Sequence, residues 1–483
     1  MRATVARPAI WVFLILLGSY AFFWHSRDWN TASRLMLTYA IVDRGTVAIT
    51  GLDRQTNDKA YYHGEYYSDK LPGFSFLAAL PYAVARWVFR LPSHPLNVPA
   101  FPFWSADYWA TLCTSGLATA AIGSILVLWA QELGCRPARA AIVGLAYGLA
   151  TPAYVYATLA YGHQVSAFAL FTSFFLVWRR QRRRDALSLL LAGFLAAYAA
   201  VIELQVGPVS AILGLYLLAQ CLRGNRHPDA LSLFAIGAVI PTLMLLAYNQ
   251  LAFGSPFEMG YFHHATKQFA DVHNPDNPLG LKIPAQFGRT LLALLWGRYR
   301  GLTFYAPILL LTVPGWIVLC VRRCWDLAIV TMLVVVAVVL VNLLYPEWTG
   351  GWSTGPRLLL PSIPFAMLPV AALLVRESRL ARVATIAAMV LALIGGIEML
   401  LFQGAGGRIP FAVNDPLVEF VWPHWIGRAP ILDRNLVAVA APQFVVRLTG
   451  GRQAVQFLPL VLMQALVLMV LRRLINSRIP NNP

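Results

Sequence analysis

Long apolar runs recur along the whole sequence and limit the kind of fold that the chain can adopt. Most of these runs are roughly 17–25 residues long, the length that an α-helix needs to cross the hydrocarbon core of a bilayer. The chain has 483 residues, of which 58% are hydrophobic and only 12% are charged, and its mean hydropathy is +0.62. We therefore predict an all-α polytopic membrane protein with about twelve transmembrane helices, forming one membrane domain over residues 1–483.

The apolar runs are separated by short Arg-rich connections or by longer segments rich in Trp, Pro and Gly. The first run follows Arg2 and Arg7 and lacks a small-residue cleavage site, so we interpret it as a retained helix rather than a removed signal peptide. The spans are predicted at residues 9–24, 105–130, 140–158, 164–178, 186–202, 206–221, 231–252, 303–320, 327–344, 358–375, 383–401 and 455–471.

The formal net charge of +17 is explained by orientation in the membrane. With both termini placed in the cytoplasm, the short cytoplasmic loops contain runs such as Arg179–Arg184 and Arg376–Arg382, and most of the positive charge lies on that side. This distribution follows the positive-inside rule. The charge thus predicts topology and gives no support for nucleic acid as a partner.

The run Gly73–Arg90 is long enough to be mistaken for a further span. If it crossed the membrane, every later loop would change sides and the Arg-rich loops would lie outside. We therefore predict an interfacial helix, interrupted at Pro81, on the outer surface. The first external loop then covers residues 25–104, a length that is usually functional. Further external loops are predicted at residues 253–302, 345–357 and 402–454.

Charged residues gather in the first loop, in the stretch TNDKAYYHGEYYSDKLPG at residues 56–73. Asp58, Lys59, Asp69 and Lys70 are candidates for a general base beside a phosphate-binding cation, because a base must be oriented and a leaving phosphate needs positive charge. The alternative is solvated turn chemistry, since Asn-Asp and Pro-Gly pairs are common turn formers. For the group as a whole we favour function.

A second group of candidates precedes a predicted span, in YPEWTGGWSTGPR at residues 345–357. Trp348 and Trp352 offer flat faces for a sugar, the glycines between them allow close backbone approach, and Arg357 lies at the membrane boundary. An aromatic belt with a snorkelling arginine is the alternative. Because three glycines exceed what such a belt requires, we favour a site role.

Other ionisable residues near predicted span ends are weaker candidates. His163 and Glu203 lie at outer ends, where such groups are functional candidates, although a structural pair explains them equally well. Arg298 precedes a span and is a candidate for phosphate contact. His263 and His264 are adjacent, a poor spacing for joint metal ligation within a helix. We therefore expect no metal and no cofactor, with a divalent metal as the open alternative.

Two of these passages resemble the GT-C superfamily of integral-membrane glycosyltransferases, especially the bacterial relatives of protein O-mannosyltransferases and aminoarabinose transferases (glycosyltransferase family 39-like). The passage SDKLPG at residues 68–73 is similar to the family's Glu-Lys-Pro-Pro, and SRLMLTYAIVDRG at residues 33–45 resembles the helix after its catalytic acidic pair. WTGGWSTGPRLLLP at residues 348–361 also resembles bacterial members. The predicted topology, with one long first external loop and interfacial helices, is similar over the whole chain.

The chain departs from the family pattern just before residue 33. Where the family has an Asp-Glu pair, this sequence has WNTA at residues 29–32, and the nearest acid is Asp28. Asp28, Asp58 and Asp69 are therefore three alternative bases, and the sequence leaves the choice among them open.

The resemblance implies transfer of one hexose or pentose from a polyprenyl-phosphate donor to a glycan, lipid or protein acceptor, at the external face of a bacterial inner membrane. On this hypothesis a loop carboxylate deprotonates the acceptor hydroxyl and the anomeric carbon is inverted. Lys70, Arg357, Arg298 and Lys59 are the expected phosphate contacts, and Trp348, Trp352, His163 and Glu203 the expected sugar or acceptor contacts.

Two other functions stay open at this point. A transporter or flippase of lipid-linked saccharides fits the partners, but its ionisable residues usually lie at midplane between repeated halves, and here they lie at one boundary. A catalytically inactive relative is the second alternative, favoured by the missing acidic pair.

Overall fold

The computed structural model describes residues 2–25, 27–91, 105–179, 186–375, 378–426, 434–435, 460–465 and 469. Over these residues the chain is mostly helical, as predicted. The α-helices are α1 Arg2–Ala21, α2 Trp29–Tyr39, α3 Gly73–Phe89, α4 Ala106–Thr111, α5 Leu117–Glu132, α6 Pro137–Leu149, α7 Ala153–Tyr156, α8 Gly162–Arg179, α9 Ala186–Ile202, α10 Gly207–Leu222, α11 Asp229–Phe253, α12 Lys267–Ala270, α13 Phe287–Trp296, α14 Leu302–Tyr305, α15 Thr312–Val321, α16 Trp325–Leu343, α17 Ile363–Leu373, α18 Arg379–Gly404 and α19 Trp422–Trp425. The strands are β1 Phe23–Trp24, β2 Lys59–Tyr62, β3 Glu65–Ser68 and β4 Arg434–Asn435.

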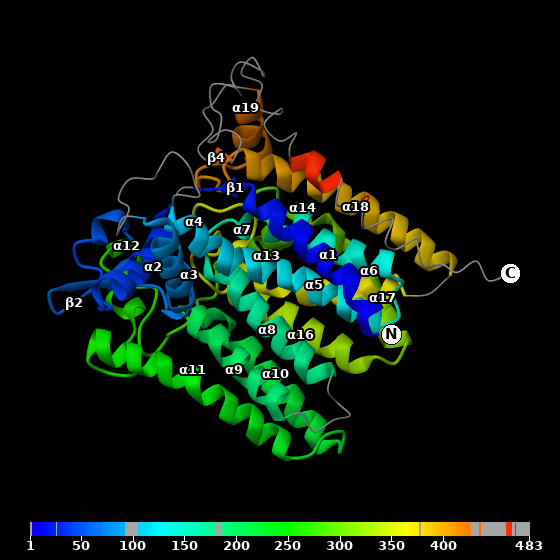
Figure 1. Ribbon diagram of the computed structural model, residues 1–483, viewed down its shortest axis with the longest axis horizontal. Helices are drawn as coiled ribbons and strands as arrows, with labels where there is room; N and C mark the ends of the chain where they lie inside the picture. The colour runs from blue at the N-terminus through cyan, green and yellow to red at the C-terminus, as the bar shows by residue number, and fades with distance from the viewer. Residues whose placement is uncertain are drawn as a thin grey trace.

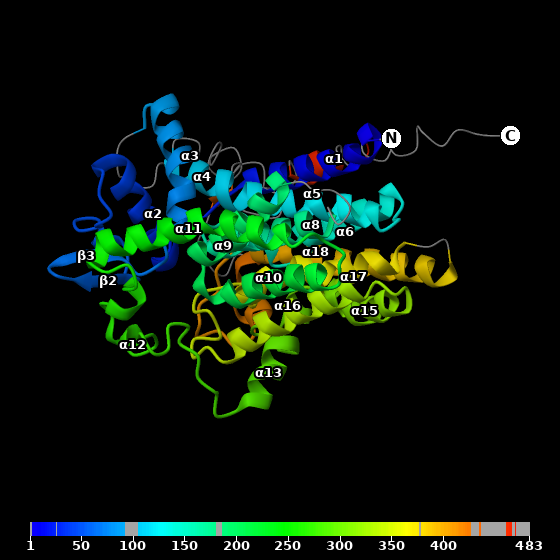
Figure 2. The same cartoon turned by 90° about the horizontal axis from the view of Figure 1, so that it is seen from below.

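The long helices run side by side along the length of the molecule, and the elements of the predicted first loop gather at one end (Figures 1 and 2). That end, where α2, α3 and the β2–β3 hairpin lie, is opposite the N-terminus in both views. We call it the loop end. Helix α1 leads from the N-terminus to the loop end, so the first helix crosses the bundle before the first long loop begins.

Five stretches of helix in the described residues are long and apolar enough to cross a membrane: Ala106–Glu132, Leu204–Leu222, Asp229–Phe253, Trp325–Leu343 and Arg379–Gly404. Shorter apolar helices lie between them, and they coincide with most of the other predicted spans. The total of about twelve spans stays a prediction. The predicted span at residues 455–471 lies mainly outside the described residues.

Prolines divide two of the predicted spans. The predicted helix 140–158 ends at Leu149, and the chain turns at Thr151-Pro152 before the short α7 begins. The predicted helix 303–320 is likewise interrupted before Pro307. A proline lacks a backbone N–H and disfavours the helical conformation of the residue before it, so both breaks fall where the sequence places Pro.

The prediction that the helix after residue 73 is interrupted at Pro81 was wrong. Helix α3 continues through Pro81 to Phe89. One side of this helix exposes a series of apolar side chains that includes Leu80, Val84 and Trp87. Such a stripe suits a helix that lies against lipid, so the interfacial position remains a prediction that this pattern favours.

Helices α9 and α11 approach each other unusually closely through two glycines. A Cβ atom on Gly193 would lie 1.8 Å from the carbonyl oxygen of Phe234, and one on Gly237 would lie 2.0 Å from that of Leu190. Small residues at helix interfaces allow this backbone approach inside membranes. The close packing fixes the position of α9, whose C-terminal end leads directly to Glu203.

The stretch of charged residues in the first loop forms an antiparallel β-hairpin. Strands β2 and β3 pair in the register Lys59↔Ser68, Ala60↔Tyr67, Tyr61↔Tyr66 and Tyr62↔Glu65. The turn between them has positive φ at His63 (47°) and Gly64 (90°), as a two-residue hairpin turn that matches strand twist requires. Ala60 also bridges to His264, so residues near 264 lie along the outer edge of β2.

Candidate functional site

The hairpin register places the two carboxylates of the first loop next to each other. Because Lys59 pairs with Ser68, Asp58 and Asp69 are the next residues on the two strands and face each other. The Lys70 Nζ atom lies 3.0 Å from Asp58 Oδ2 and 2.6 Å from Asp69 Oδ2. The three predicted site residues Asp58, Asp69 and Lys70 therefore form one compact cluster.

Asp69 is the more enclosed of the two acids, with a side chain that is 1% exposed. Its Oδ1 accepts a hydrogen bond from Ser33 Oγ at 3.1 Å, and its Oδ2 lies 3.4 Å from His264 Nε2 as well as next to Lys70. Burial acts to raise the pKa of Asp69, but Lys70 and His264 outweigh it and hold this pKa below its usual value. Asp69 is thus a permanent carboxylate whose contacts hold Lys70 and His264 in place.

Asp58 has a different environment. Its side chain is 15% exposed, and within the described residues Oδ1 has no partner, while Oδ2 contacts Lys70. Burial raises the pKa of the Asp58 carboxyl above its usual value, against the opposing effect of Lys70. An ionised carboxylate with a raised pKa and one unused oxygen has the properties of a general base.

Lys70 remains charged in this buried position. Burial acts to lower its pKa, but Asp58 and Asp69 outweigh that effect and raise the pKa above the usual value. An ammonium group has three N–H donors, and the two carboxylates use two of them. The third can serve an anionic oxygen of a ligand.

Asp58, Asp69 and His264 also form a group that could hold a metal ion, because their ligand atoms lie within 4.8 Å of one another. The sequence analysis missed this group, since it judged His264 only with His263, whereas the partners come from the hairpin. The Lys70 ammonium lies against the same two carboxylates. A bound divalent cation would have to share them with Lys70, against mutual repulsion.

Asp28, the third predicted base, caps helix α2. Its Oδ1 accepts hydrogen bonds from the backbone N–H and the hydroxyl of Thr31, at 2.8 and 2.9 Å, in a capping box. The Tyr161 hydroxyl donates to Oδ2, and Arg408 Nη1 lies 3.8 Å from the same oxygen. Both oxygens of Asp28 are therefore occupied.

Arg357 joins this part of the site through an aromatic ring. Its guanidinium carbon lies 4.9 Å from the centroid of the Tyr161 ring, a cation–π distance. Gly350, which has a positive φ of 71°, leaves room for this side chain, since a Cβ at that position would lie 3.0 Å from Arg357 Nε. Within the described residues, the buried Nε has no hydrogen-bond partner. The glycines before Arg357 thus have the steric role that their spacing suggested.

Arg300 organises the same loop and was not among the predicted site residues. It is fully buried and donates hydrogen bonds to the carbonyl oxygens of Thr349 at 2.8 Å, Gly351 at 2.9 Å and Tyr299 at 3.0 Å. Its neighbour Arg298 is 71% exposed and pairs with Asp415 at 2.9 Å. The signal WGRYRGL gives both arginines equal weight, and only the fold separates them.

Arg34 is a further site residue that the sequence analysis did not select. It lies on α2 with a side chain that is 1% exposed, and its Nη2 is 2.6 Å from Glu203 Oε1. His163 Nδ1 lies 3.5 Å from the same carboxylate oxygen. His163 and Glu203, predicted as contacts of the sugar or acceptor, therefore do come together, and Arg34 is the cation that neutralises Glu203.

The remaining predicted residues lie apart from this cluster. Lys59 points to the other side of the hairpin, as strand alternation requires, where Nζ lies 3.0 Å from Asp53 Oδ2. Trp348 packs against the core of the bundle, and Trp352 is largely exposed. Among the described residues, none of the three contacts Lys70 or Asp58 in the structure.

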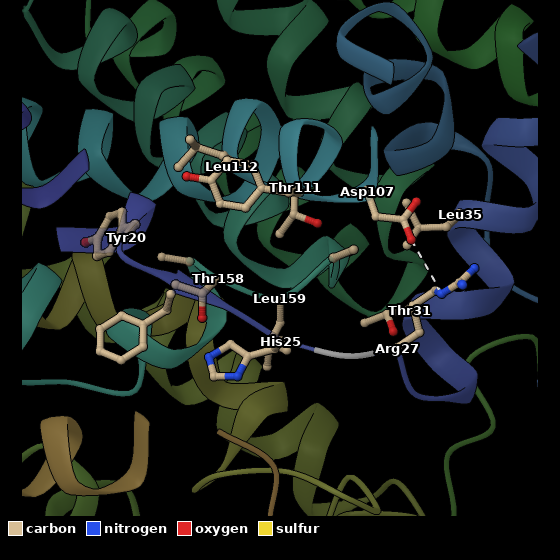
Figure 3. A pocket seen from close by; sticks show the side chains of 14 residues that line it. Tyr20, His25, Arg27, Thr31, Leu35, Asp107, Thr111, Leu112, Thr158 and Leu159 are labelled. Carbon is tan, nitrogen blue, oxygen red and sulfur yellow. Dashed lines mark ion pairs between the residues drawn. The ribbon is translucent and has the colours of Figure 1, made fainter. Parts of the chain in front are cut away.

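A cavity of about 510 Å³, partly open, lies beside the first turn of α2. Figure 3 shows its lining, with Thr31 and Leu35 from α2 facing Asp107 and the segment that contains Thr158 and Leu159. Arg27 Nε is 3.4 Å from Asp107 Oδ2 at one edge. Because Thr31 contacts both this cavity and Asp28, the cavity adjoins the capping carboxylate.

No protein-family model and no curated protein matches the sequence. Among solved structures, the chain is similar to ArnT from Cupriavidus metallidurans bound to undecaprenyl phosphate, with 13% identity, a TM-score of 0.48 and coverage of 99% of this chain and 77% of ArnT. It is also similar to the archaeal oligosaccharyltransferase AglB from Archaeoglobus fulgidus in complex with an inhibitory peptide and a dolichol-phosphate, with 12% identity, a TM-score of 0.49 and coverage of 89% of this chain and 58% of AglB. At these scores the similarities carry no argument about activity, which is argued below from the side chains of this chain.

Proposed function

We propose that the protein is a membrane glycosyltransferase that moves one sugar from a polyprenyl-phosphate donor to an acceptor hydroxyl at the loop end of the bundle. The observation that carries this proposal is the Lys70 ammonium, buried between Asp58 and Asp69 with one donor to spare. The resemblance of SDKLPG to the Glu-Lys-Pro-Pro passage of GT-C enzymes supports the same assignment. The predicted topology places this end outside the cell.

In the proposed reaction, the acceptor oxygen forms a bond to the anomeric carbon while the bond from that carbon to the phosphate oxygen breaks. The acceptor proton passes to a carboxylate, and the lipid phosphate leaves with one more negative charge. Lys70 and Arg357 are the cations that stabilise this developing charge, which is a larger effect in a buried site than in water. Because the attack comes from the side opposite the leaving group, the anomeric configuration is inverted.

We assign the proton transfer to Asp58. Asp69 has both oxygens occupied by Ser33, Lys70 and His264, and both oxygens of Asp28 are likewise occupied. Asp58 alone among the three predicted acids has an oxygen without a partner in the described residues, and its pKa is raised. On this assignment Asp69 positions Lys70, and Asp28 fixes the start of α2.

The two lysines of the hairpin provide a matched test. Lys70→Ala is expected to lower turnover of a synthetic decaprenyl-phosphate sugar by about a hundredfold or more, the scale of a lost transition-state contact. Lys59→Ala removes a lysine that faces Asp53 instead, and it should keep turnover within a few-fold of the wild type. Equal activity of both variants would rule out the assignment.

The transport alternative is tested with the same lipid in vesicles that contain the purified protein. An enzyme consumes the lipid-phosphate sugar and releases decaprenyl phosphate when an acceptor is present, whereas a flippase moves the lipid to the other leaflet unchanged. Movement without any chemical change would replace the proposed function.

A further inference from the structure

A narrow cavity adjoins the Arg34–Glu203 pair and has no role in the steps described above. It encloses about 290 Å³ of space free of protein atoms, part of it open to solvent. Its polar lining comes from His163, Glu203, Gln205 and Asn342, and the rest of the wall is apolar. Asn342 belongs to the last turn of α16 and Gln205 to the short 3-10 helix Leu204–Val206, so three separate elements supply the polar groups.

Two of these lining residues have buried polar atoms that lack partners. Asn342 is 2% exposed, and neither its Oδ1 nor its Nδ2 has a hydrogen-bond partner within the described residues. The Nε2 atom of the buried His163 is in the same position. Buried donors and acceptors of this kind are normally satisfied, because leaving them unpaired is costly. The cavity therefore presents groups that are ready to bond a polar ligand.

The charge balance of the cavity indicates which ligand fits. The Glu203 carboxylate is already neutralised by Arg34 at 2.6 Å, and the amides of Gln205 and Asn342 carry no charge. An amide offers both donors and an acceptor, which suits adjacent hydroxyl groups. A second phosphate or an ammonium group would find no unpaired opposite charge here and would be buried at a cost.

The cavity also lies next to the proposed phosphate contacts. Leu358, which lines it, follows Arg357 directly in the chain. Lys70 and Arg357 both act electrostatically on Glu203, so the three charged groups share one region. A sugar attached to a phosphate at Lys70 and Arg357 has this polar cavity within its surroundings.

We propose that the cavity binds the sugar ring of the donor, that this sugar is uncharged, and that Asn342 and Gln205 determine its specificity by hydrogen bonding to its hydroxyl groups. The inference rests on the proposed function and extends it from the lipid phosphate to the sugar. An ordered water that bridges Asn342 and His163 is the competing explanation.

The test compares the binding of bare decaprenyl phosphate with that of decaprenyl phosphate carrying glucose, mannose, galactose, arabinose, glucuronate or aminoarabinose. The full-length purified protein is titrated in detergent. We expect at least one neutral sugar to tighten binding by about tenfold or more over the bare lipid phosphate, as expected for a site built to bond hydroxyls. Asn342→Leu and Gln205→Leu should each remove most of that gain while leaving binding of the bare lipid phosphate within about twofold.

The control is Thr331→Val, which removes another buried hydrogen-bonding group from the same helix α16, away from the cavity lining. It should leave the sugar-dependent gain unchanged. If no neutral sugar tightens binding, if a charged sugar is preferred, or if Asn342→Leu and Gln205→Leu leave the gain intact, the cavity is no sugar site, and Lys70-dependent binding of the bare lipid phosphate would still support the proposed function. If bare decaprenyl phosphate binds independently of Lys70, the proposed function and this inference both fall.

Discussion

Asp58 and Asp69 face each other one residue beyond the last pair of the β2–β3 hairpin, and the Lys70 ammonium contacts both, at 3.0 and 2.6 Å. Eleven positions of sequence separate the two acids, yet the turn at His63-Gly64 makes them neighbours. Their environments nevertheless differ, since Asp69 has both oxygens occupied whereas Asp58 keeps one unused. The same residue type therefore has two distinct roles within one cluster.

Substitution of each acid by its amide should separate these roles. Asp58→Asn is expected to lower the turnover number by about 10²–10⁴-fold, the range for loss of a general base, and to leave binding of bare decaprenyl phosphate nearly unchanged. Asp69→Asn should instead weaken that binding, because Lys70 loses the contact that positions it. Single-turnover kinetics and lipid titration on both variants measure the two effects. The assignment fails if Asp58→Asn remains as active as the wild type.

The proposed base also predicts the acidic limb of the pH profile. Asp58 must be ionised to accept a proton, and burial raises its pKa above the ordinary value of 3.8, so kcat/KM should fall as the pH decreases through that raised pKa. The lowered pKa of Asp69 keeps this group ionised over the same range. A pH–rate profile of the wild type and of Asp58→Glu checks this, because a limb that belongs to residue 58 should shift in the variant. An unchanged limb would assign it to another group.

Gly162 is predicted to be intolerant of any side chain. A Cβ atom there would lie 2.5 Å from Glu203 Oε1, the oxygen that pairs with Arg34. Gly162→Ala should therefore displace Glu203 and destabilise the protein by about 1–3 kcal/mol, as overpacking does. Thermal unfolding in detergent measures the loss. Gly207→Ala is the control, because a Cβ at Gly207 meets no atom within 4 Å, and similar unfolding temperatures for the two variants would contradict the prediction.

The hairpin turn should control the site from a distance. Gly64 has a φ of 90°, where an L-residue costs on the order of 1–3 kcal/mol, so Gly64→Ala is expected to loosen the register that places Asp58 opposite Asp69 and to reduce lipid-phosphate binding. His63→Asn should preserve binding, because asparagine tolerates the positive φ of 47° at that position. Titration with bare decaprenyl phosphate compares the two variants. Full binding by Gly64→Ala would show that the turn does not set the register.

The sequence by itself determined the membrane class of the protein and the positions of most helices. Apolar length carries that information, because a helix in lipid must satisfy its own backbone hydrogen bonds over a fixed thickness. The breaks at Pro152 and Pro307 follow from local chemistry that a hydropathy pattern does not weigh. The continuity of α3 through Pro81 shows the converse, since one lost backbone hydrogen bond does not interrupt an otherwise strongly apolar helix.

Sequence also indicated the cluster of Asp58, Asp69 and Lys70, but not its geometry or its partners. Whether Lys59 or Lys70 turns inward depends on strand alternation and register, which long-range packing fixes. Arg34 and His264 have no distinctive sequence context, and they enter the site only because α2 and the segment beside β2 pack against the hairpin. The tertiary structure alone decided these contacts, because they join residues that are distant in sequence and depend on burial, which no local pattern encodes.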